Sequence, residues 1–322
     1  MLPPPSRRAA LSPVAILERA ASVFPGRTGV VDGERRWTWA QLAERARRLA
    51  VALQQAGIGH GDRVAIVAPS SPELLEAHFG VPAAGAVLVA VDGRLAEAEI
   101  ADMLERSLVR LLVVDAGLEP LGAAAAGRAG VPRVLVCGPG ADSYEAFLAG
   151  ARGDRPAAGP VFEEDVLSVT YGAAAGDGTA GVATTHRAAY LDALAEVHHA
   201  RLDTRSVYLW TVPLLHAGGG VSFPWAVTAA AAKHVCVREV DEATLGRRLA
   251  EEGVTHLGAL PSAPAPAEPA PPATQEPLWS RGRAEEAPGF RIRRVPVALE
   301  AGADPALALA LAAPRRRAGV AA

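Results

Sequence analysis

The sequence has 322 residues, half of them hydrophobic, and a formal net charge of −3. This length corresponds to one large or two modest domains at about 100–200 residues each. The balance of 32 basic and 35 acidic residues excludes the overall basic surface that nucleic-acid-binding domains present, and a charged fraction of 21% excludes a polar disordered chain. No apolar run reaches the roughly 18 residues of a membrane-spanning helix, and no secretory leader opens the chain. We therefore expect a cytoplasmic protein without a membrane span and without a nucleic-acid partner.

The basic residues are almost all arginine, and Lys233 is the one lysine of the sequence. Arginine keeps its charge in proteins, whereas a buried lysine can become a reactive amine, so a mechanism that needs lysine has one candidate. The position of Lys233 at the start of a strand predicts a solvated strand end instead. Cys137 and Cys236 lie in apolar runs and are predicted to be small buried hydrophobic residues.

The first elements are marked by capping and turn signals. Residues 1–13 are Pro-rich and are expected to form a flexible leader. Ser12 and Pro13 then provide an N-cap and a first-turn proline for a helix that runs to residue 24.

A hairpin is predicted next, because Asp32-Gly33 separates two β-prone stretches. Thr38 and Gln41 have the spacing of a capping box for a second helix, which Gly57 ends.

Apolar strand-like runs then alternate with helical segments. Strands are predicted at 63–68, 87–91, 109–114 and 133–137, with helices at 72–84, 97–106 and 118–129. After a connector at 150–160, further strands are predicted at 166–171, 207–213, 234–237, 255–260 and 290–299, with helices at 185–200 and 241–252. This alternation predicts an α/β fold of doubly wound, largely parallel sheets flanked by helices. The predicted parts are a first α/β subdomain at 14–150, a second α/β portion at 151–262, and a Pro/Ala-rich, partly disordered tail at 263–322.

The segment 171–182 carries the clearest sign of chemistry. It contains four glycines, among them Gly176, Gly178 and Gly181, between a predicted strand and a predicted helix. Glycine lets backbone N–H groups turn toward a ligand, and a helix start favours phosphate. The segment therefore indicates either a phosphate-binding loop or a flexible surface loop, although it matches neither the Rossmann nor the Walker pattern.

Five motifs occur in order between residues 12 and 262. They are Trp37-Thr38-Trp39-Ala40-Gln41-Leu42, the turn at residues 57–65, Thr185-His186-Arg187, the segment 207–216 that ends Pro213-Leu214-Leu215-His216, and Gly253-Val254-Thr255-His256-Leu257 with Pro261. Together they resemble the N-terminal domain of the adenylate-forming (AMP-binding) superfamily, most closely fatty acyl-CoA ligases of the acyl-CoA synthetase type. The resemblance implies ATP with Mg²⁺, and CoA, as cofactors. It implies a nucleotide site at Tyr171, Gly176, Gly178, Thr179, Gly181, Thr184 and Thr185, and a substrate pocket at His216, Gly218 and Gly219.

The phosphate loop departs from the family pattern, which reads Thr-Ser-Gly-Thr-Thr-Gly-x-Pro-Lys-Gly after a tyrosine. Placed on Tyr171 and Gly181, the lysine of that pattern falls on Ala180 and the proline on Thr179. The hydroxyl residues of the pattern fall on Gly172, Ala173, Ala175 and Gly176. Replacing a charged phosphate donor with a methyl group removes a hydrogen bond worth on the order of 1.5–3 kcal/mol, so we expect impaired adenylation and doubtful use of these cofactors.

The later motifs of the family, and its mobile C-terminal domain with a catalytic lysine, find no counterpart after residue 262 beyond a faint likeness at 300–305. Lys233 occupies neither family lysine position. We therefore expect a truncated chain that lacks the C-terminal domain and has no catalytic residue of its own. Three functions stay open. The first is a degenerate protein that retains acyl or nucleotide binding, or that partners a complete ligase or a carrier protein. The second is an active ligase that receives its missing parts in trans, and the third is a non-functional remnant.

Other polar residues give weaker signals. His186 is a candidate general base, but no nucleophile motif accompanies it. His198 and His199 are adjacent on a helix, about 100° apart, so they do not share a face and no metal site is predicted. Asp92 and Asp115 follow predicted parallel strands, where α/β sheets bind ligands and where turn chemistry also favours aspartate.

Overall fold

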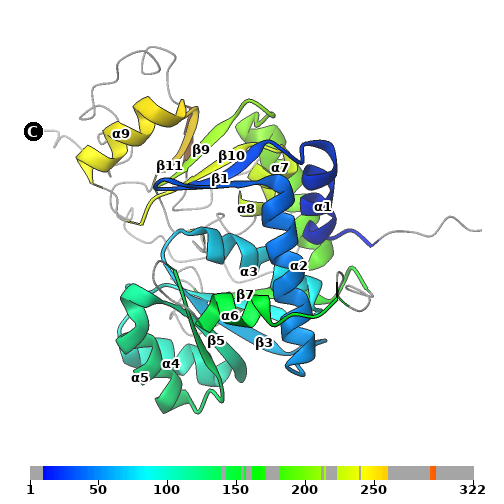
Figure 1. Cartoon of the computed structure of the whole chain (residues 1–322), viewed down its shortest axis with the longest axis vertical. Coiled ribbons are helices and arrows are strands. Elements are labelled where there is room, and N and C mark those ends of the chain that lie inside the picture. The colour runs from blue at the N-terminus through cyan, green and yellow to red at the C-terminus, as the bar shows by residue number, and fades with distance from the viewer. Residues whose placement is uncertain are drawn as a thin grey trace, which may run out of the picture.

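The computed structural model describes residues 10–138, 143–153, 156, 162–171, 181–211, 214, 223–238, 241–259 and 291–294. Their strands form two six-stranded sheets, here called sheet A and sheet B, with helices between and outside them (Figure 1). Among the described strand pairs, antiparallel pairing occurs at sheet edges, and the remaining pairs are parallel. The predicted α/β class with largely parallel sheets is therefore confirmed.

The strand order of each sheet mixes segments that are far apart in the chain. Sheet A has the order β12 (Arg291–Arg294), β11 (His256–Ala259), β9 (Val207–Trp210), β10 (Lys233–Cys236), β1 (Thr28–Asp32), β2 (Arg35–Thr38). Sheet B has the order β6 (Val134–Cys137), β5 (Val109–Asp115), β3 (Arg63–Val67), β4 (Val87–Val91), β7 (Val166–Tyr171), β8 (Gly181–Thr185).

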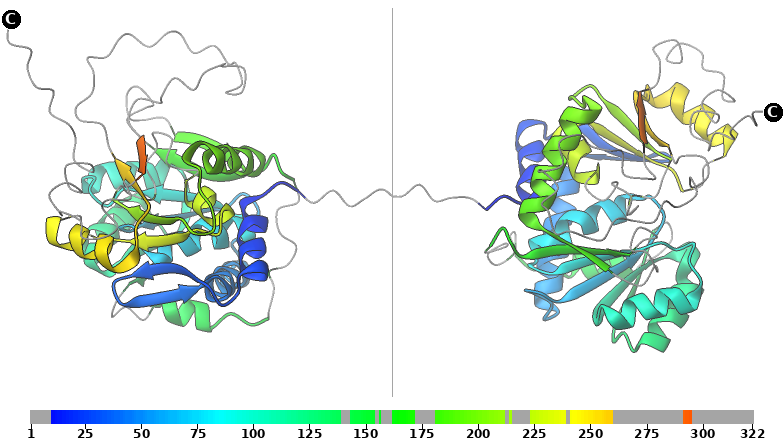
Figure 2. Two further views of the ribbon diagram at one scale, coloured as in Figure 1. Left: turned by 90° about the horizontal axis from the view of Figure 1, so that it is seen from above. Right: turned by 180° about the vertical axis from the view of Figure 1, so that it is seen from behind.

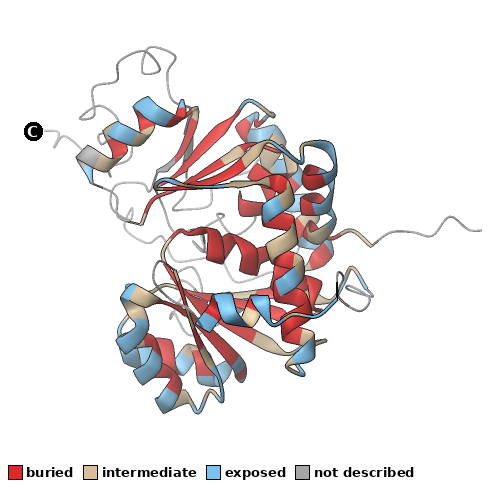
Figure 3. Cartoon of the chain, in the orientation of Figure 1, coloured by how far each residue is buried: buried red, intermediate tan, exposed pale blue. Residues whose placement is uncertain are grey.

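The helices form layers around the two sheets. They are α1 (Pro13–Val23), α2 (Trp39–Gln55), α3 (Pro72–Ala83), α4 (Glu97–Arg106), α5 (Glu119–Ala129), α6 (Ser143–Ala149), α7 (His186–Ala200), α8 (Phe223–Ala229) and α9 (Glu242–Glu252), with a short 3₁₀ turn, η1 (Ala116–Leu118). Helices α1, α2, α3, α7 and α8 contribute to the core between the sheets, whereas α9 packs outside sheet A and α4 and α5 outside sheet B (Figures 1 and 2). Every residue of α3 is buried, as Figure 3 shows.

Alternate residues of the strands enter different cores, because successive side chains of a strand face opposite sides of the sheet. In β1, Val30 packs between the sheets and Val31 packs under α9. In β3, Ile66 packs between the sheets and Val67 packs under α4 and α5. Strands covered on both faces need apolar residues at every position, which explains the continuous apolar runs in the sequence.

The sheets do not follow the predicted division of the chain at residue 150. The N-terminal hairpin β1–β2 joins β9, β10 and β11 in sheet A, and the later hairpin β7–β8 completes sheet B. Which sheet a hairpin joins depends on which sheet edge is open for pairing in the folded protein. The order of elements along the chain does not show this.

Two α-helices and one strand are absent from the sequence prediction, besides the short turn η1. Helix α6 follows β6, and α8 is too uniformly apolar to show a helical period, since its first six residues are all buried. Strand β8 lies where the sequence suggested a loop leading directly into a helix. The predicted capping residues are confirmed at Ser12, Thr38 and Asp241, each of which accepts a hydrogen bond from a backbone N–H of the first turn.

The predicted boundaries at the two ends are tested only in part. Pro13 is the first residue of α1 and the Ser12 side chain caps it, so the fold begins before the predicted end of the leader at residue 13. Residues 1–9 lie outside the described part. The predicted tail at 263–322 also lies outside it, apart from β12, which occupies part of the strand predicted at 290–299.

Candidate nucleotide and acyl site

The glycine-rich segment connects two antiparallel strands. Tyr171, the last residue of β7, pairs with Gly181, the first residue of β8, so residues 172–180 join the two ends of a hairpin. Gly176, Gly178 and Thr179 of the predicted nucleotide site lie outside the described residues. The predicted helix α7 follows β8 directly, because Thr185 is its N-cap.

The described hydroxyl groups of the predicted nucleotide site are engaged with protein groups at two positions. The Tyr171 hydroxyl lies 2.7 Å from Oγ of Ser107, and Oγ1 of Thr185 accepts a hydrogen bond of 3.2 Å from the N–H of Ala188. Thr184 is half-buried and pairs in register with Ser168 of β7. Both hydroxyls therefore have a protein partner, and the Thr185 hydroxyl, which accepts there, keeps its own proton for a further acceptor.

His186 is buried, and its surroundings do not suit the general-base role considered from the sequence. Its Nδ1 lies 2.8 Å from Oγ of Ser12, and its side chain is the first of α7. Burial lowers the pKa of His186 to about 4, against the attraction of Asp165. Ser12 is 4% exposed and serves as the N-cap of α1, so this serine–histidine pair links two helix starts and is closed to a substrate.

Lys233 is not a solvated strand end, and that expectation is wrong. Its Nζ lies 2.8 Å from Oε2 of Glu252 and donates to the backbone carbonyl of the same residue at 3.0 Å. Arg36 of β2 binds the same carboxylate at 2.6 Å. The only lysine of the sequence therefore belongs to an ion cluster that links sheet A to α9. Cys137 and Cys236 are each 1% exposed, which confirms them as buried apolar residues.

Arg238 connects strand ends of the two sheets. Its Nη1 lies 2.6 Å from Oδ2 of Asp115, the last residue of β5, and its Nε lies 3.8 Å from Oδ2 of Asp32, the last residue of β1. Asp32 also pairs with Arg35, which reaches Oε1 of buried Glu73 at 3.0 Å. The carboxyl ends of parallel strands are where open α/β sheets bind ligands. The sequence pointed to Asp115 at this edge and missed Arg238, whose only signal was its position just after a strand.

The segment that carries the predicted substrate pocket joins β9 to α8, and His216, Gly218 and Gly219 lie outside the described residues. The elements on either side meet in a packed cluster of aromatic rings. Trp210 donates its Nε1–H to Nδ1 of His234 at 3.2 Å, and Nε2 of His234 lies 3.1 Å from Oγ1 of Thr228, which donates to a backbone carbonyl. These contacts assign a neutral imidazole with its proton on Nε2, and burial lowers the pKa of His234 to about 3.

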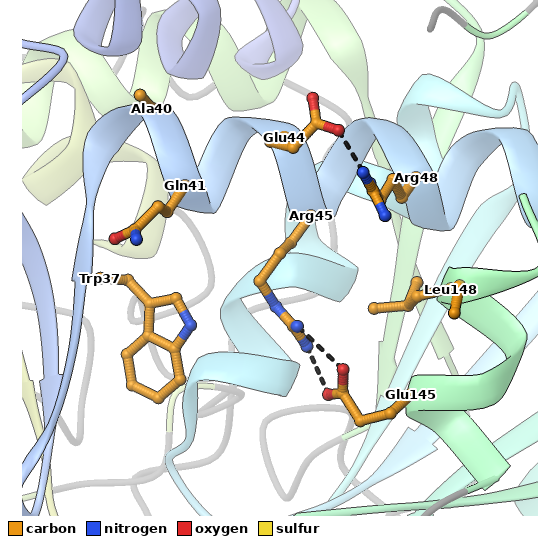
Figure 4. Close-up of a pocket in the computed structure, with 9 residues that line it drawn as sticks. Trp37, Ala40, Gln41, Glu44, Arg45, Arg48, Glu145 and Leu148 are labelled. Carbon is orange, nitrogen blue, oxygen red and sulfur yellow. Dashed lines mark hydrogen bonds and ion pairs between the residues drawn. The ribbon is translucent and has the colours of Figure 1, made fainter. Parts of the chain in front are cut away.

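A surface hollow of about 520 Å³ lies elsewhere, between α2 and α6 (Figure 4). None of the predicted site residues lines it. The hollow is lined by Trp37, Ala40, Gln41, Glu44, Arg45, Arg48, Glu145, Leu148 and Ala149. Arg45 forms two ion pairs. Its Nη2 lies 2.6 Å from Oε1 of Glu145 at the rim of the hollow, and its Nε lies 2.5 Å from Oε1 of the buried Glu76. Burial raises the pKa of Glu76 to about 7, whereas the hydrogen bond from Arg45 lowers the pKa of Glu145.

No group of three or more histidine, cysteine, aspartate or glutamate side chains is placed to hold a metal ion within the described ranges. No described helix is long and apolar enough to cross a membrane.

Two mostly parallel sheets with helices between and outside them define an α/β protein, and comparison with known proteins identifies the family. The model of the AMP-binding enzyme family matches residues 17–267. The chain belongs to this family, and the resemblance to adenylate-forming acyl-CoA ligases is confirmed.

Curated relatives include CoA ligases for short carboxylic acids. The chain is 35% identical over 279 residues to the peroxisomal acetate/butyrate–CoA ligase AAE7 of Arabidopsis thaliana, with 80% of this chain and 49% of that protein covered. It is 35% identical to the acetate–CoA ligase CCL3 of Humulus lupulus, with 78% and 48% covered. The chain therefore spans about half the length of the curated relatives it matches.

Solved structures of the family share the fold. The N-terminal domain of FACL13 from Mycobacterium tuberculosis, crystallised with an inhibitor, aligns with a TM-score of 0.69 and 25% identity over 76% of this chain and 61% of that one. A benzoate CoA ligase from Burkholderia xenovorans LB400 aligns with a TM-score of 0.65 and 25% identity over 74% and 48%.

Proposed function

We propose that this chain binds a nucleotide or an acyl ligand through its AMP-binding fold and carries out little adenylation by itself. The observation that carries the proposal concerns lysine. Lys233, the only lysine of the sequence, is held in an ion pair with Glu252, and Ala180 stands where the family pattern, set on Tyr171 and Gly181, places the phosphate-loop lysine. Without a cation at that place, the negative charge that develops on the phosphates loses its stabilisation, at a cost of roughly a hundred-fold or more in rate.

The names of the relatives suggest the ligand class. Acetate/butyrate–CoA and acetate–CoA ligases act on short carboxylic acids by their names, so we propose short acyl groups as the first ligands to test. The site residues of the glycine-rich segment, the pocket at His216, a complete ligase or carrier protein as partner, and a cytoplasmic location remain parts of the same proposal.

ATP–pyrophosphate exchange with acetate, butyrate and longer carboxylates tests the catalytic half. We expect exchange near background for the natural chain and a measurable rise for Ala180→Lys, which returns a cation to the loop. Ala188→Lys, at an exposed position of α7, is the matched control and is expected to leave exchange at background. Robust exchange by the natural chain would overturn the proposed impairment.

Thermal melting tests the binding half. A ligand at 100 times its Kd stabilises the folded state by about 2.7 kcal/mol, so ATP, AMP or a short acyl-CoA should raise the midpoint of a cooperative melt. A melt that none of these ligands moves would favour the remnant reading and contradict the binding proposal.

A further inference from the structure

The surface hollow between α2 and α6 contains the guanidinium group of Arg45 (Figure 4). Its volume of about 520 Å³ lies within the range of about 300–1,000 Å³ that small-molecule sites occupy. The half-buried ring of Trp37, from β2, and the side chain of Leu148, from α6, line the same hollow. The hollow therefore combines a charged group with apolar walls, which is the usual composition of a site for a small ligand.

The inner edge of the Arg45 guanidinium is held by a buried carboxylate. Its Nε lies 2.5 Å from Oε1 of Glu76, and its Nη2 donates to Oε2 of the same residue at 3.2 Å. Glu76 is 0% exposed, and the hydroxyl of buried Tyr144 donates to its Oε2 at 3.0 Å. The guanidinium is therefore oriented before any ligand arrives, which lowers the entropy that binding at its outer edge would cost.

The outer edge of the same guanidinium binds a second carboxylate, which lies at the surface. Nη1 and Nη2 of Arg45 donate to the two oxygens of Glu145, at 3.0 and 2.6 Å. Two such hydrogen bonds are the geometry in which arginine recognises a carboxylate. The Glu145 side chain is 52% exposed, and ion pairs with an exposed partner are weak. Another carboxylate can therefore take the place of Glu145 while the Glu145 side chain turns into water.

We propose that the hollow binds a small carboxylic acid with an apolar body, whose carboxylate replaces Glu145 on Arg45 and whose apolar part lies against Trp37. Glu145 is then a competitor within the chain, which occupies the site when the ligand is absent. The exchange leaves the charge of the cluster unchanged, because one carboxylate replaces another. None of the described residues of the predicted nucleotide site lines the hollow, so this site does not depend on the proposed function.

NMR of the tryptophan indole N–H groups during a titration with phenylacetate tests the site. We expect the signal of Trp37, assigned with Trp37→Phe, to shift in a saturable way, because this ring lines the hollow. The signals of buried Trp39, Trp210 and Trp225 should stay in place. The alcohol 2-phenylethanol has the apolar body without the carboxylate, and acetate has the carboxylate without that body. Both should bind more weakly than phenylacetate.

Two variants at the site test the exchange of carboxylates. Glu145→Gln removes the charge of the competitor and should tighten phenylacetate binding up to about fivefold. Glu18→Gln, which removes an ion pair of Arg47 on the same helix face region outside the hollow, is its matched control. Arg45→Lys keeps a charge beside Glu76 but cannot form two parallel hydrogen bonds, so it should weaken binding at least about tenfold. Arg47→Lys is the control for this variant, and both controls should leave binding unchanged.

The Trp37 signal decides between the outcomes. A shift that saturates at lower phenylacetate concentration in Glu145→Gln and at higher concentration in Arg45→Lys supports the site, whether or not ATP or an acyl ligand binds elsewhere. No shift in either the natural chain or Glu145→Gln would overturn the proposal. Equal affinities in the natural chain and Glu145→Gln would also overturn it. Unchanged signals of the buried tryptophans show that a variant is folded, and if Arg45→Lys does not fold, Glu145→Gln decides alone.

Discussion

The two sheets carry edge hairpins that follow the same plan. Hairpin β1–β2 lies at one edge of sheet A and β7–β8 lies at one edge of sheet B. Each leads directly into a helix whose N-cap is a threonine, Thr38 for α2 and Thr185 for α7. Each also has a glycine facing an aromatic ring, Gly29 against Trp39 and Gly181 against Tyr171.

The hairpins differ in the connection between their strands. In β1–β2, Gly33 and Glu34 join Asp32 to its partner Arg35, and Gly33 has a φ of 65°, which glycine adopts at no steric cost. In β7–β8 the connection spans residues 172–180. Two residues are enough to reverse a chain, and hairpin loops of about 2–5 residues are usual. The longer connection at β7–β8 is the segment to which the proposed function assigns ligand binding.

Acidification should destabilise the protein in part through His186, at the helix start after β8. The pKa of His186 is lowered by burial to about 4, so the unfolded chain takes up the proton before the folded protein does. The stability that this group contributes is complete above pH 6.5 and decreases as pH falls to about 4, by up to about 3 kcal/mol. Urea unfolding between pH 7 and pH 4 measures it. In His186→Asn the acid-induced loss should be smaller by this amount, while buried His234 and His78 keep their own contributions. Equal pH profiles would contradict the assignment.

Replacing each ring-facing glycine by alanine should destabilise the protein by different amounts in the two hairpins. A Cβ at residue 29 would lie 2.7 Å from Cδ2 of Trp39, a ring with 0% exposure that cannot move aside. We expect Gly29→Ala to lower the free energy of unfolding by about 1–3 kcal/mol. Gly181→Ala should cost less, about 1 kcal/mol, because Tyr171 and Val169 are half-buried at an edge. Gly26→Ala, with open space around it, is the control for thermal melting. A larger loss for Gly181→Ala would reverse this ranking.

Removing the threonine N-caps of α2 and α7 should give the smallest difference in unfolding free energy between the two hairpins. Thr38→Ala and Thr185→Ala should each cost about 1 kcal/mol in urea unfolding. The side chain of Gln41 returns a hydrogen bond to the backbone of Thr38, at 2.8 Å, and completes a capping box. Gln41→Ala should therefore weaken α2 further, by about 0.5 kcal/mol, the low end of what one hydrogen bond contributes. If Gln41→Ala has no effect, the two caps are energetically equivalent despite the box.

Local sequence signals predicted the individual elements well, for reasons that lie within a few residues of each other. Ser12, Thr38 and Asp241 cap helices because a short side-chain oxygen reaches an N–H of the next turn. The buried strands were visible as continuous apolar runs, since both of their faces are covered. The family resemblance rested on similar short motifs, and the match to residues 17–267 confirms it.

The arrangement of the site required the tertiary structure. The sequence alone determined the α/β class, most strands and helices, and a glycine-rich segment next to Tyr171. It did not show that the early strand β1 lies in one sheet with β9, β10 and β11, or that the later strand β7 lies in the sheet of β3 and β4. It also did not show that Arg238 joins Asp32 to Asp115, or that Lys233 is bound to Glu252. Helix caps and apolar periodicity depend on neighbours in the chain, whereas ion pairs and sheet edges depend on which distant segments fold against each other. The sequence showed that Lys233 is the only lysine, but only the fold shows that its ammonium group is paired with the Glu252 carboxylate.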